Sequence, residues 1–199
     1  MKKSKTKSEI SRQNIIEGTI DIIAANGIEG LSIRAIAKHV GVEHSRIYYY
    51  FKNKDDLIFN VMVYITDLFK NELISRDIYN IKNDEELFKA IMNVFYDYSY
   101  KNPKPTMAYR SFCFLPDNHI SKEIFNKTFD TIYSNFLYTD LIISMSKSSK
   151  TIQILGFENV SFITRTIADF AINNAIRNIS TSKEQIDTYI DALWKAIKD

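Results

Sequence analysis

The chain has 199 residues, of which 45% are hydrophobic and 25% are charged, a balance typical of a folded protein and not of a disordered one. Five glycines and three prolines are too few for the tight turns of a β-sandwich or barrel, so we expect long helices. One cysteine, Cys113, excludes an internal disulfide and a multi-thiolate metal site, and no uncharged apolar stretch reaches the roughly 18 residues of a membrane span. The basic start lacks the apolar core of a secretory signal, so we expect a cytoplasmic protein.

Charge is unevenly distributed along the chain. Residues 1–54 carry ten lysines and arginines against five acids, a net charge of +5, whereas residues 55–199 carry a net charge of −3. A basic amino-terminal segment favours a polyanionic partner. An ordinary solvated surface also fits this asymmetry, so charge alone does not decide between the two.

The first predicted helix covers Ser11 to Asn26, where isoleucines recur at helical spacing before Gly27. A two-turn helix then follows Ser32, a suitable N-cap, and ends at Gly41. A second short helix is expected from Glu43 to about Phe51. Two short helices joined by a tight turn with glycine at its left-handed position form a helix-turn-helix. Its second helix would present hydrogen-bond donors and aromatic rings outward: His44, Ser45, Arg46, Tyr48, Tyr49 and Tyr50.

Residues 11–57, and in particular LSIRAIAKHVGVEHSRIYYYFKNKDDL, resemble the DNA-binding domain of the TetR family of bacterial transcriptional regulators. The resemblance implies an all-α fold of about nine helices. Residues 1–54 would form a three-helix DNA-binding domain with a basic arm, and residues 55–199 a helical domain for ligand binding and dimerisation. It also implies a repressor that a small, largely apolar or aromatic effector releases from a palindromic operator, in the bacterial cytoplasm and associated with the nucleoid.

Further helices are expected along the rest of the chain. The fourth helix opens at Asn53, pairs that residue with Asp56 in a capping arrangement, and continues to about Ser75. The segment 139–156, rich in serine, is read as a loop or a frayed helix end. Hydrophobic periodicity and proline positions predict the remaining helices at about 84–101, 105–114, 119–138, 157–178 and 182–198.

The resemblance assigns DNA contacts to particular side chains. Base edges in the major groove would be read by Arg34, His44, Ser45 and Arg46. Phosphate or sugar contacts would come from hydroxyl and ammonium groups: Ser32, Tyr48, Tyr49, Tyr50 and Lys54. Tyr48 and Tyr50 also fit a purely packing role, and the amino-terminal arm fits either a backbone contact or a disordered tail.

The body is rich in aromatic residues, which suit either a ligand pocket or a plain core. The ligand-binding candidates are Phe95, Tyr98, Tyr109, Arg110, Phe112, Phe129 and Tyr133. The last two helices, about 157–198, are apolar on more than one face, which predicts a homodimer through a four-helix bundle; a monomer core is the alternative. On the final helix the predicted stripe is Ile186, Ile190, Leu193 and Ile197.

No motif of an enzyme is recognised, and His39, His44 and His119 are too far apart in sequence to indicate a metal cluster. We therefore expect neither catalysis nor a cofactor. Cys113, between two phenylalanines, fits a buried apolar residue or a thiol sensor. Two other functions stay open: a DNA-bound architectural protein regulated by a protein partner, and a helical lipid carrier.

Overall fold

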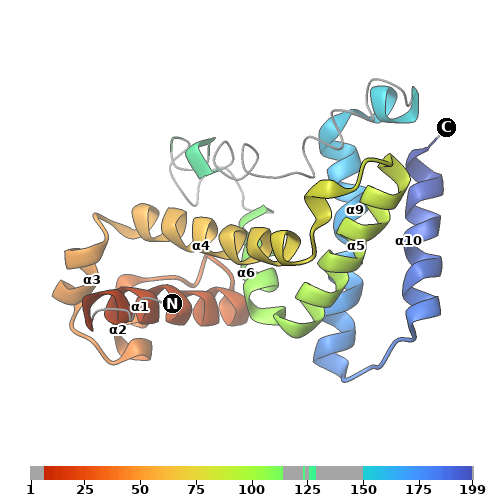
Figure 1. Cartoon of the computed structure of the whole chain (residues 1–199). Coiled ribbons are helices and arrows are strands. Elements are labelled where there is room, and N and C mark those ends of the chain that lie inside the picture. Colours follow the sequence, from red (N-terminus) through yellow and green to blue (C-terminus); the bar gives the residue numbers. More distant parts are fainter. Residues whose placement is uncertain (1–6, 114–122, 124–125, 129–149, 199) are drawn as a thin grey trace. The chain divides into compact units, whose positions relative to one another are not determined.

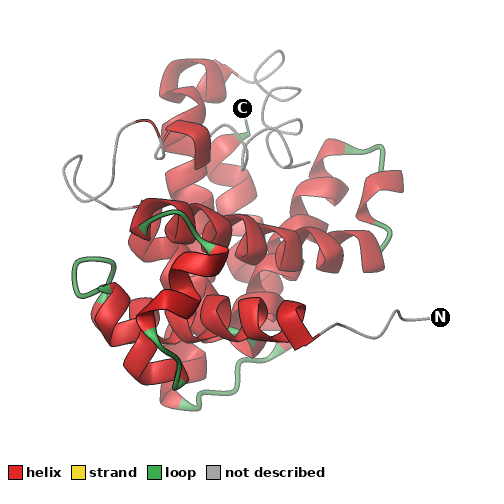
Figure 2. Ribbon diagram, turned by 90° about the vertical axis from the view of Figure 1, so that its left-hand side faces the viewer, coloured by secondary structure: helices red, strands yellow, loops and turns green. Residues whose placement is uncertain are grey.

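A computed structural model describes residues 7–113, 123, 126–128 and 150–198. Within this part of the chain every regular element is helical, which confirms the predicted all-α fold (Figures 1 and 2). No helix of the described residues is long and apolar enough to cross a membrane. The elements are α1 (Lys7–Asn26), α2 (Ile33–Val40), α3 (His44–Tyr50), α4 (Lys54–Ser75), a short 3₁₀ helix η1 (Ile78–Asn80), α5 (Asp84–Lys101), α6 (Pro103–Cys113), α9 (Lys150–Arg177) and α10 (Lys183–Ile197).

Three helix starts differ from the prediction. Helix α1 begins four residues before Ser11. Helix α6 begins at Pro103 and not at 105, because proline needs no amide partner in the first turn and its φ angle already suits a helix. Helix α9 begins at Lys150 and not at 157. The last residues of the segment 139–156, for which a loop or a frayed helix end was expected, are therefore helical. Most of the helix predicted at 119–138 lies outside the described residues.

The described residues divide into two compact units. The first unit comprises those within 1–66 and 104–132, and the second those within 67–103 and 133–199. Helix α4 is one continuous helix that contributes to both units. Its Leu57, Ile58, Val61 and Met62 are buried in the first unit, and its Phe69 and Leu73 are buried in the second.

In the first unit, α1 and α2 approach closely at Gly18. A Cβ atom built at this glycine would lie 2.2 Å from Cγ1 of Val40 and 3.2 Å from Cδ2 of His39. The apolar face of α1 contributes Ile15, Ile16 and Ile23 to the core, as the isoleucine periodicity predicted. Glycine at position 18 therefore lets α2 lie directly against α1.

In the second unit, α5, α9 and α10 enclose one hydrophobic core that includes Phe88, Ile91 and Ile167. Helix α10 places Ile186, Ile190, Trp194 and Ile197 in this core, whereas Leu193 is only partly buried against it. The stripe predicted for self-association thus packs largely within its own chain, with Trp194 in place of Leu193. A dimer that uses α9 and α10 must use their remaining faces.

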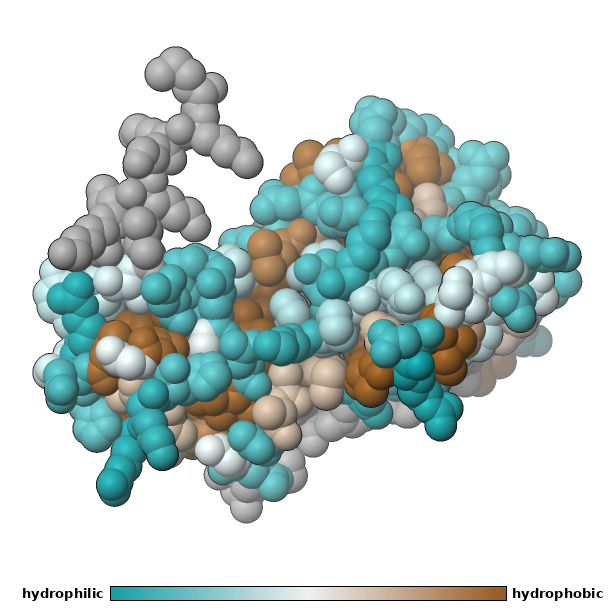
Figure 3. Space-filling model, turned by 90° about the horizontal axis from the view of Figure 1, so that it is seen from below, coloured by the Kyte–Doolittle hydropathy of each residue, from teal (hydrophilic) through white to brown (hydrophobic). Residues whose placement is uncertain are grey.

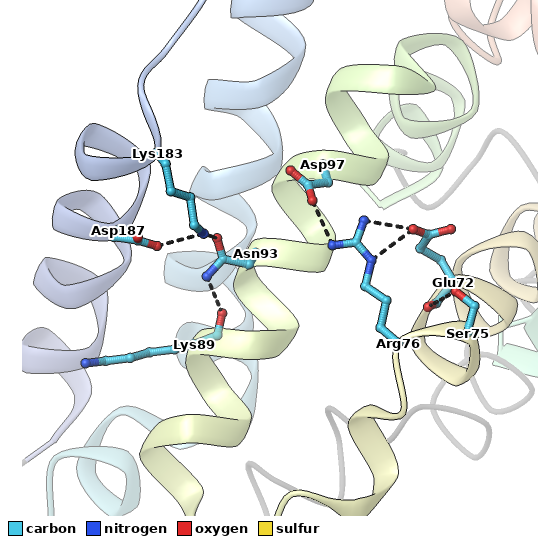
Figure 4. Close-up of polar contacts among 8 residues, drawn as sticks. All are labelled: Glu72, Ser75, Arg76, Lys89, Asn93, Asp97, Lys183 and Asp187. Carbon is cyan, nitrogen blue, oxygen red and sulfur yellow. Dashed lines mark hydrogen bonds and ion pairs between the residues drawn. The ribbon is translucent and has the colours of Figure 1, made fainter.

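A row of polar side chains on α5 ties this helix to its neighbours (Figure 4). The Lys89 ammonium lies 2.8 Å from Glu85 and 2.7 Å from Asp191 of α10, and these hydrogen bonds raise the pKa of Lys89. One turn further on, Asn93 accepts a hydrogen bond from Lys183 of α10. Another turn on, Asp97 accepts one from the Arg76 Nη1 atom at 2.7 Å. These contacts connect α10 and the end of α4 through α5.

Arg76, just after α4, is held by two carboxylates. Its Nε and Nη2 atoms donate to Glu72 Oε1 at 3.0 and 2.8 Å, in addition to the bond to Asp97 (Figure 4). These hydrogen bonds outweigh desolvation and raise the pKa of the Arg76 guanidinium. The end of α4 is therefore fixed against α5 within the second unit.

The variant Gly18→Ala tests the close approach of α1 and α2. Alanine in a helix interior normally stabilises by about 1 kcal/mol relative to glycine. Here we expect a net loss of about 1–2 kcal/mol in the free energy of unfolding, because the stiff Val40 side chain leaves no room for the methyl group. Urea denaturation followed by circular dichroism measures the change. The double variant G18A/V40A should lose less than the sum of the single variants, and a more stable G18A protein would contradict the prediction.

Candidate nucleic-acid interface

Helix α2 and its turn are set by local signals. The Ser32 hydroxyl accepts a hydrogen bond from the Ala35 amide at 3.1 Å and so caps α2, as predicted. Gly41 adopts φ 70° and ψ 37°, the left-handed conformation in which glycine avoids a Cβ penalty. The next amide, of Val42, bonds to the Ala37 carbonyl at 3.0 Å and closes the turn. The chain then enters α3 (Figure 1).

Helix α3 has seven residues and buries only one of them, Ile47. Five of its other side chains are exposed: His44, Ser45 and Arg46, together with Tyr48 and Tyr49, which are exposed to 55% and 74%. The exposure of Tyr48 excludes the alternative that it packs between helices in this chain. A short helix therefore presents imidazole, hydroxyl, guanidinium and phenol groups together.

The remaining candidates flank this helix. Ser32 and Arg34 are exposed at the start of α2, and Lys54 is half-buried at the start of α4. Tyr50 is half-buried, and its ring contacts that of Tyr49 edge-on at 4.9 Å. The predicted DNA contacts thus all belong to the first unit, on α2, α3 and the first residue of α4.

Arg46 is held loosely in this structure. Its Nη2 atom donates to the Ser11 hydroxyl of α1 at 3.4 Å, and its Cζ atom lies 5.7 Å from the centroid of the Tyr50 ring. A hydrogen bond of this length at an exposed site is weak. The guanidinium is therefore displayed near α1 and can turn toward another acceptor at little cost.

Arg12, which the sequence analysis did not single out, makes a firmer contact. Its Nη2 atom donates to Oδ1 of Asn60 on α4 at 2.6 Å, and its Cζ atom lies 5.1 Å from the centroid of the Phe51 ring. The two hydrogen-bonded residues are 48 positions apart, so no local spacing in the sequence indicates the pair.

The start of α4 is capped as the sequence predicted. The pairing of Asn53 with Asp56 is present, because Asn53 Oδ1 accepts a hydrogen bond from the Asp56 amide at 2.8 Å.

An ionic contact joins three helices of the first unit. Lys104 on α6 donates to Oδ1 of Asp21 on α1 at 2.7 Å, and Nε2 of His39 on α2 lies 3.4 Å from the other carboxylate oxygen. The hydrogen bond from Lys104, followed by that with His39, outweighs desolvation and lowers the pKa of Asp21. His39 is exposed, as predicted for a surface residue. Among the described residues no three His, Cys, Asp or Glu side chains are grouped to hold a metal ion.

The ligand-binding candidates fall in both units. In the second unit, the Phe95 ring stacks on Phe69 of α4 at 4.2 Å, and the buried Tyr98 meets Phe69 edge-on at 5.6 Å. In the first unit, Phe112 is buried, Tyr109 is half-buried and Arg110 is exposed. Phe129 and Tyr133 lie outside the described residues, as does the Cys113 side chain.

Comparison with known proteins finds a family match for the amino-terminal part of the first unit. Residues 15–61 match the profile of the bacterial regulatory proteins of the tetR family. A transcriptional regulator of Staphylococcus aureus is 27% identical over 177 residues, which cover 85% of this chain and 91% of that protein. The fatty acid metabolism regulator of Bacillus subtilis is 40% identical over 47 residues, only 24% of each chain. A transcriptional repressor of Mycobacterium tuberculosis is 36% identical over 52 residues, 26% of this chain and 20% of that one.

Solved structures share the fold over almost the whole chain. A TetR family regulator from Marinobacter aquaeolei has a TM-score of 0.74 at 18% identity, covering 95% of this chain and 96% of that one. The regulator FadR from Bacillus subtilis, solved in complex with stearoyl-CoA, has a TM-score of 0.61 at 15% identity, with 93% and 96% covered. The sequence match, the fold and the exposed helix α3 agree: residues 15–61 form a DNA-binding domain of the tetR family of bacterial regulatory proteins, and the chain, with the fold of solved TetR regulators, is a DNA-binding transcriptional regulator.

Proposed function

We propose that this chain is a repressor that binds a palindromic operator as a homodimer and leaves it when a small, largely apolar or aromatic ligand binds. Residues 1–54 would contact DNA, and residues 55–199 would bind the ligand and form the dimer, in the cytoplasm and on the nucleoid. The observation that carries the proposal is the outward face of α3, where five of seven side chains are exposed and all five carry polar groups.

The exposed groups divide by chemistry into two kinds of DNA contact. Arg34, His44, Ser45 and Arg46 suit base edges, because their donors match the acceptors of the major groove. Ser32, Tyr48, Tyr49, Tyr50 and Lys54 suit phosphate oxygens, which accept hydrogen bonds whatever the base sequence. A helix of seven residues is also short enough to enter the major groove along its whole length.

Helix α4 is the natural route from ligand to DNA. Its Phe69 lies against the candidates Phe95 and Tyr98 in the second unit, while its first residue, Lys54, is a candidate DNA contact in the first. A ligand that prefers one arrangement of Phe69 would therefore favour one pose of α4. Coupling of about 1–3 kcal/mol would change DNA affinity roughly 5- to 150-fold. The stearoyl-CoA complex of the Bacillus subtilis relative suggests a ligand with a long apolar chain.

Exposed isoleucines on α9 support the dimer. Ile154 and Ile176 are both exposed, the latter to 59%, and their separation of 22 residues places them near one face of the helix. The face of the molecule in Figure 3 is mainly polar, with apolar side chains in separate patches. Burial of exposed isoleucines against a second copy would stabilise a symmetric pair, which also matches a palindromic operator.

Two variants test the division of DNA contacts. Genomic fragments captured by the wild-type protein supply the binding site, and fluorescence anisotropy at several salt concentrations measures affinity. Lys54→Ala should weaken binding to every sequence and reduce the slope of log K against log[salt] by about 0.9, whereas Arg34→Ala should also relax the choice of base at one position. Lys82→Ala, which removes an exposed lysine of the second unit, is the control. Capture with unchanged strength and selectivity by both variants would contradict the assignment.

Ligand release is tested with stearoyl-CoA as the first probe. Titration into the protein–DNA complex should lower DNA affinity by about 5- to 150-fold. Phe95→Leu should weaken this response, because Phe95 stacks on the Phe69 ring, and the DNA affinity of the same variant without ligand serves as the reference. Native mass spectrometry of freshly purified protein identifies any retained compound as a second probe. DNA affinity that neither probe changes would contradict the proposal.

The dimer is tested by light scattering after size exclusion. The wild-type mass should be twice the chain mass of 23.2 kDa. Ile176→Glu should reduce it toward one chain, because a buried, unpaired carboxylate is costly at an apolar interface. Ile74→Glu makes the same change at a residue of similar exposure, 54%, on α4 and should leave the mass unchanged. A dimer that persists in I176E would place the interface elsewhere.

A further inference from the structure

We infer that Arg12 is a positioning residue for DNA binding: its guanidinium fixes the turn between α3 and α4 and does not itself neutralise a phosphate. The inference deepens the DNA-binding role proposed above and rests on it. Arg12 lies in the first unit near the start of α1, within the basic segment whose charge fits either a polyanionic partner or an ordinary solvated surface.

The guanidinium contacts both sides of the turn. On the α3 side, it lies over the ring of Phe51, the C-cap residue that directly follows α3 and is 1% exposed. On the α4 side, it donates to Oδ1 of Asn60 at 2.6 Å. A planar guanidinium suits both contacts at once, because its face covers the ring while its edge donates hydrogen bonds.

The contact continues from Asn60 into the turn itself. Asn60 Nδ2 donates to the Asp56 carbonyl at 2.7 Å and to Asp56 Oδ1 at 3.1 Å, so the amide is oriented with its oxygen toward Arg12. Asp56 Oδ2 in turn accepts from the Lys52 amide at 2.9 Å, and the Asp56 amide donates to Asn53. A chain of hydrogen bonds thus runs from α1 through the second turn of α4 to the two exposed residues that join α3 and α4.

Arg46 provides the contrast within the same surface. Its hydrogen bond to Ser11 is 3.4 Å long, against 2.6 Å for Arg12 with Asn60, and its side chain is exposed whereas that of Arg12 is half-buried. The two neighbours Ser11 and Arg12 therefore act differently: Ser11 holds Arg46 weakly, and Arg12 is itself held firmly. Arg46 is available to DNA, while Arg12 is occupied by the protein.

Fixing this turn matters because α3 is short. With only Ile47 of its own in the core, α3 depends on its two ends for its position. If Arg12 is removed, the turn gains freedom that DNA binding must then remove, and this cost lowers affinity for every sequence without losing a phosphate contact.

The salt dependence of DNA binding separates positioning from a direct contact. We measure the affinity of the full-length protein for a captured genomic fragment between about 50 and 200 mM salt. Arg12→Ala and Asn60→Ala should each weaken binding about tenfold, the effect of one charge-assisted hydrogen bond, with the slope of log K against log[salt] unchanged. The double variant R12A/N60A should be no weaker than R12A, because both substitutions break the same link. Lys54→Ala is the matched control, whose slope should fall by about 0.9.

Arg12→Lys adds a rescue test, for which a phosphate contact and a positioning role predict opposite results. Lysine keeps the positive charge but not the planar fork, so it should fail to restore affinity if Arg12 positions the turn. Thermal melting shows whether each variant folds. If R12A does not fold, the test is made with N60A, which leaves Arg12 in place. A slope reduced by about 0.9 in R12A, with N60A unaffected and R12K active, would overturn the inference while leaving DNA binding intact. A wild-type protein that captures no fragment would overturn both.

Discussion

A seven-residue helix is too short to be stable by itself in water, and this constraint governs the DNA-binding unit. Helix α3 buries one side chain, Ile47, and exposes five of the other six. Its conformation must therefore come from its surroundings: the left-handed Gly41 on one side and the turn into α4 on the other. Helix α3 can carry many exposed polar side chains because the surrounding residues, and not its own buried side chains, hold it in a helical conformation.

The scaffold is built from close packing and a small number of directed polar contacts. Glycine at position 18 brings α2 against α1, and the pair Arg12–Asn60 ties α1 to α4. In the second unit, carboxylates and lysines along α5 hold α10 and the end of α4. Exposed ion pairs of this kind add little energy individually, so the buried apolar side chains of each unit supply most of the stability.

The elements that the sequence predicted well depend on neighbouring residues. A serine cap, a glycine turn and isoleucines at helical spacing lie within a few positions of one another, so α2 and α3 were placed to within a residue. Arg12 and Asn60 carry no such signal, because only the folded chain brings them together. The stripe of α10 was assigned to a second copy because an amphipathic pattern shows that a face is buried, not which chain covers it. Pro103 was read as a break, although proline fits the first turn of a helix.

The continuity of α4 through both units has a mechanical consequence. Its 22 residues make a rod about 33 Å long. A tilt of about 5° around one end displaces the other by about 3 Å, close to the roughly 3.4 Å rise between successive base pairs. In the proposed repressor, a small change in packing around Phe69 would thus become, at Lys54, a displacement of about one base-pair step.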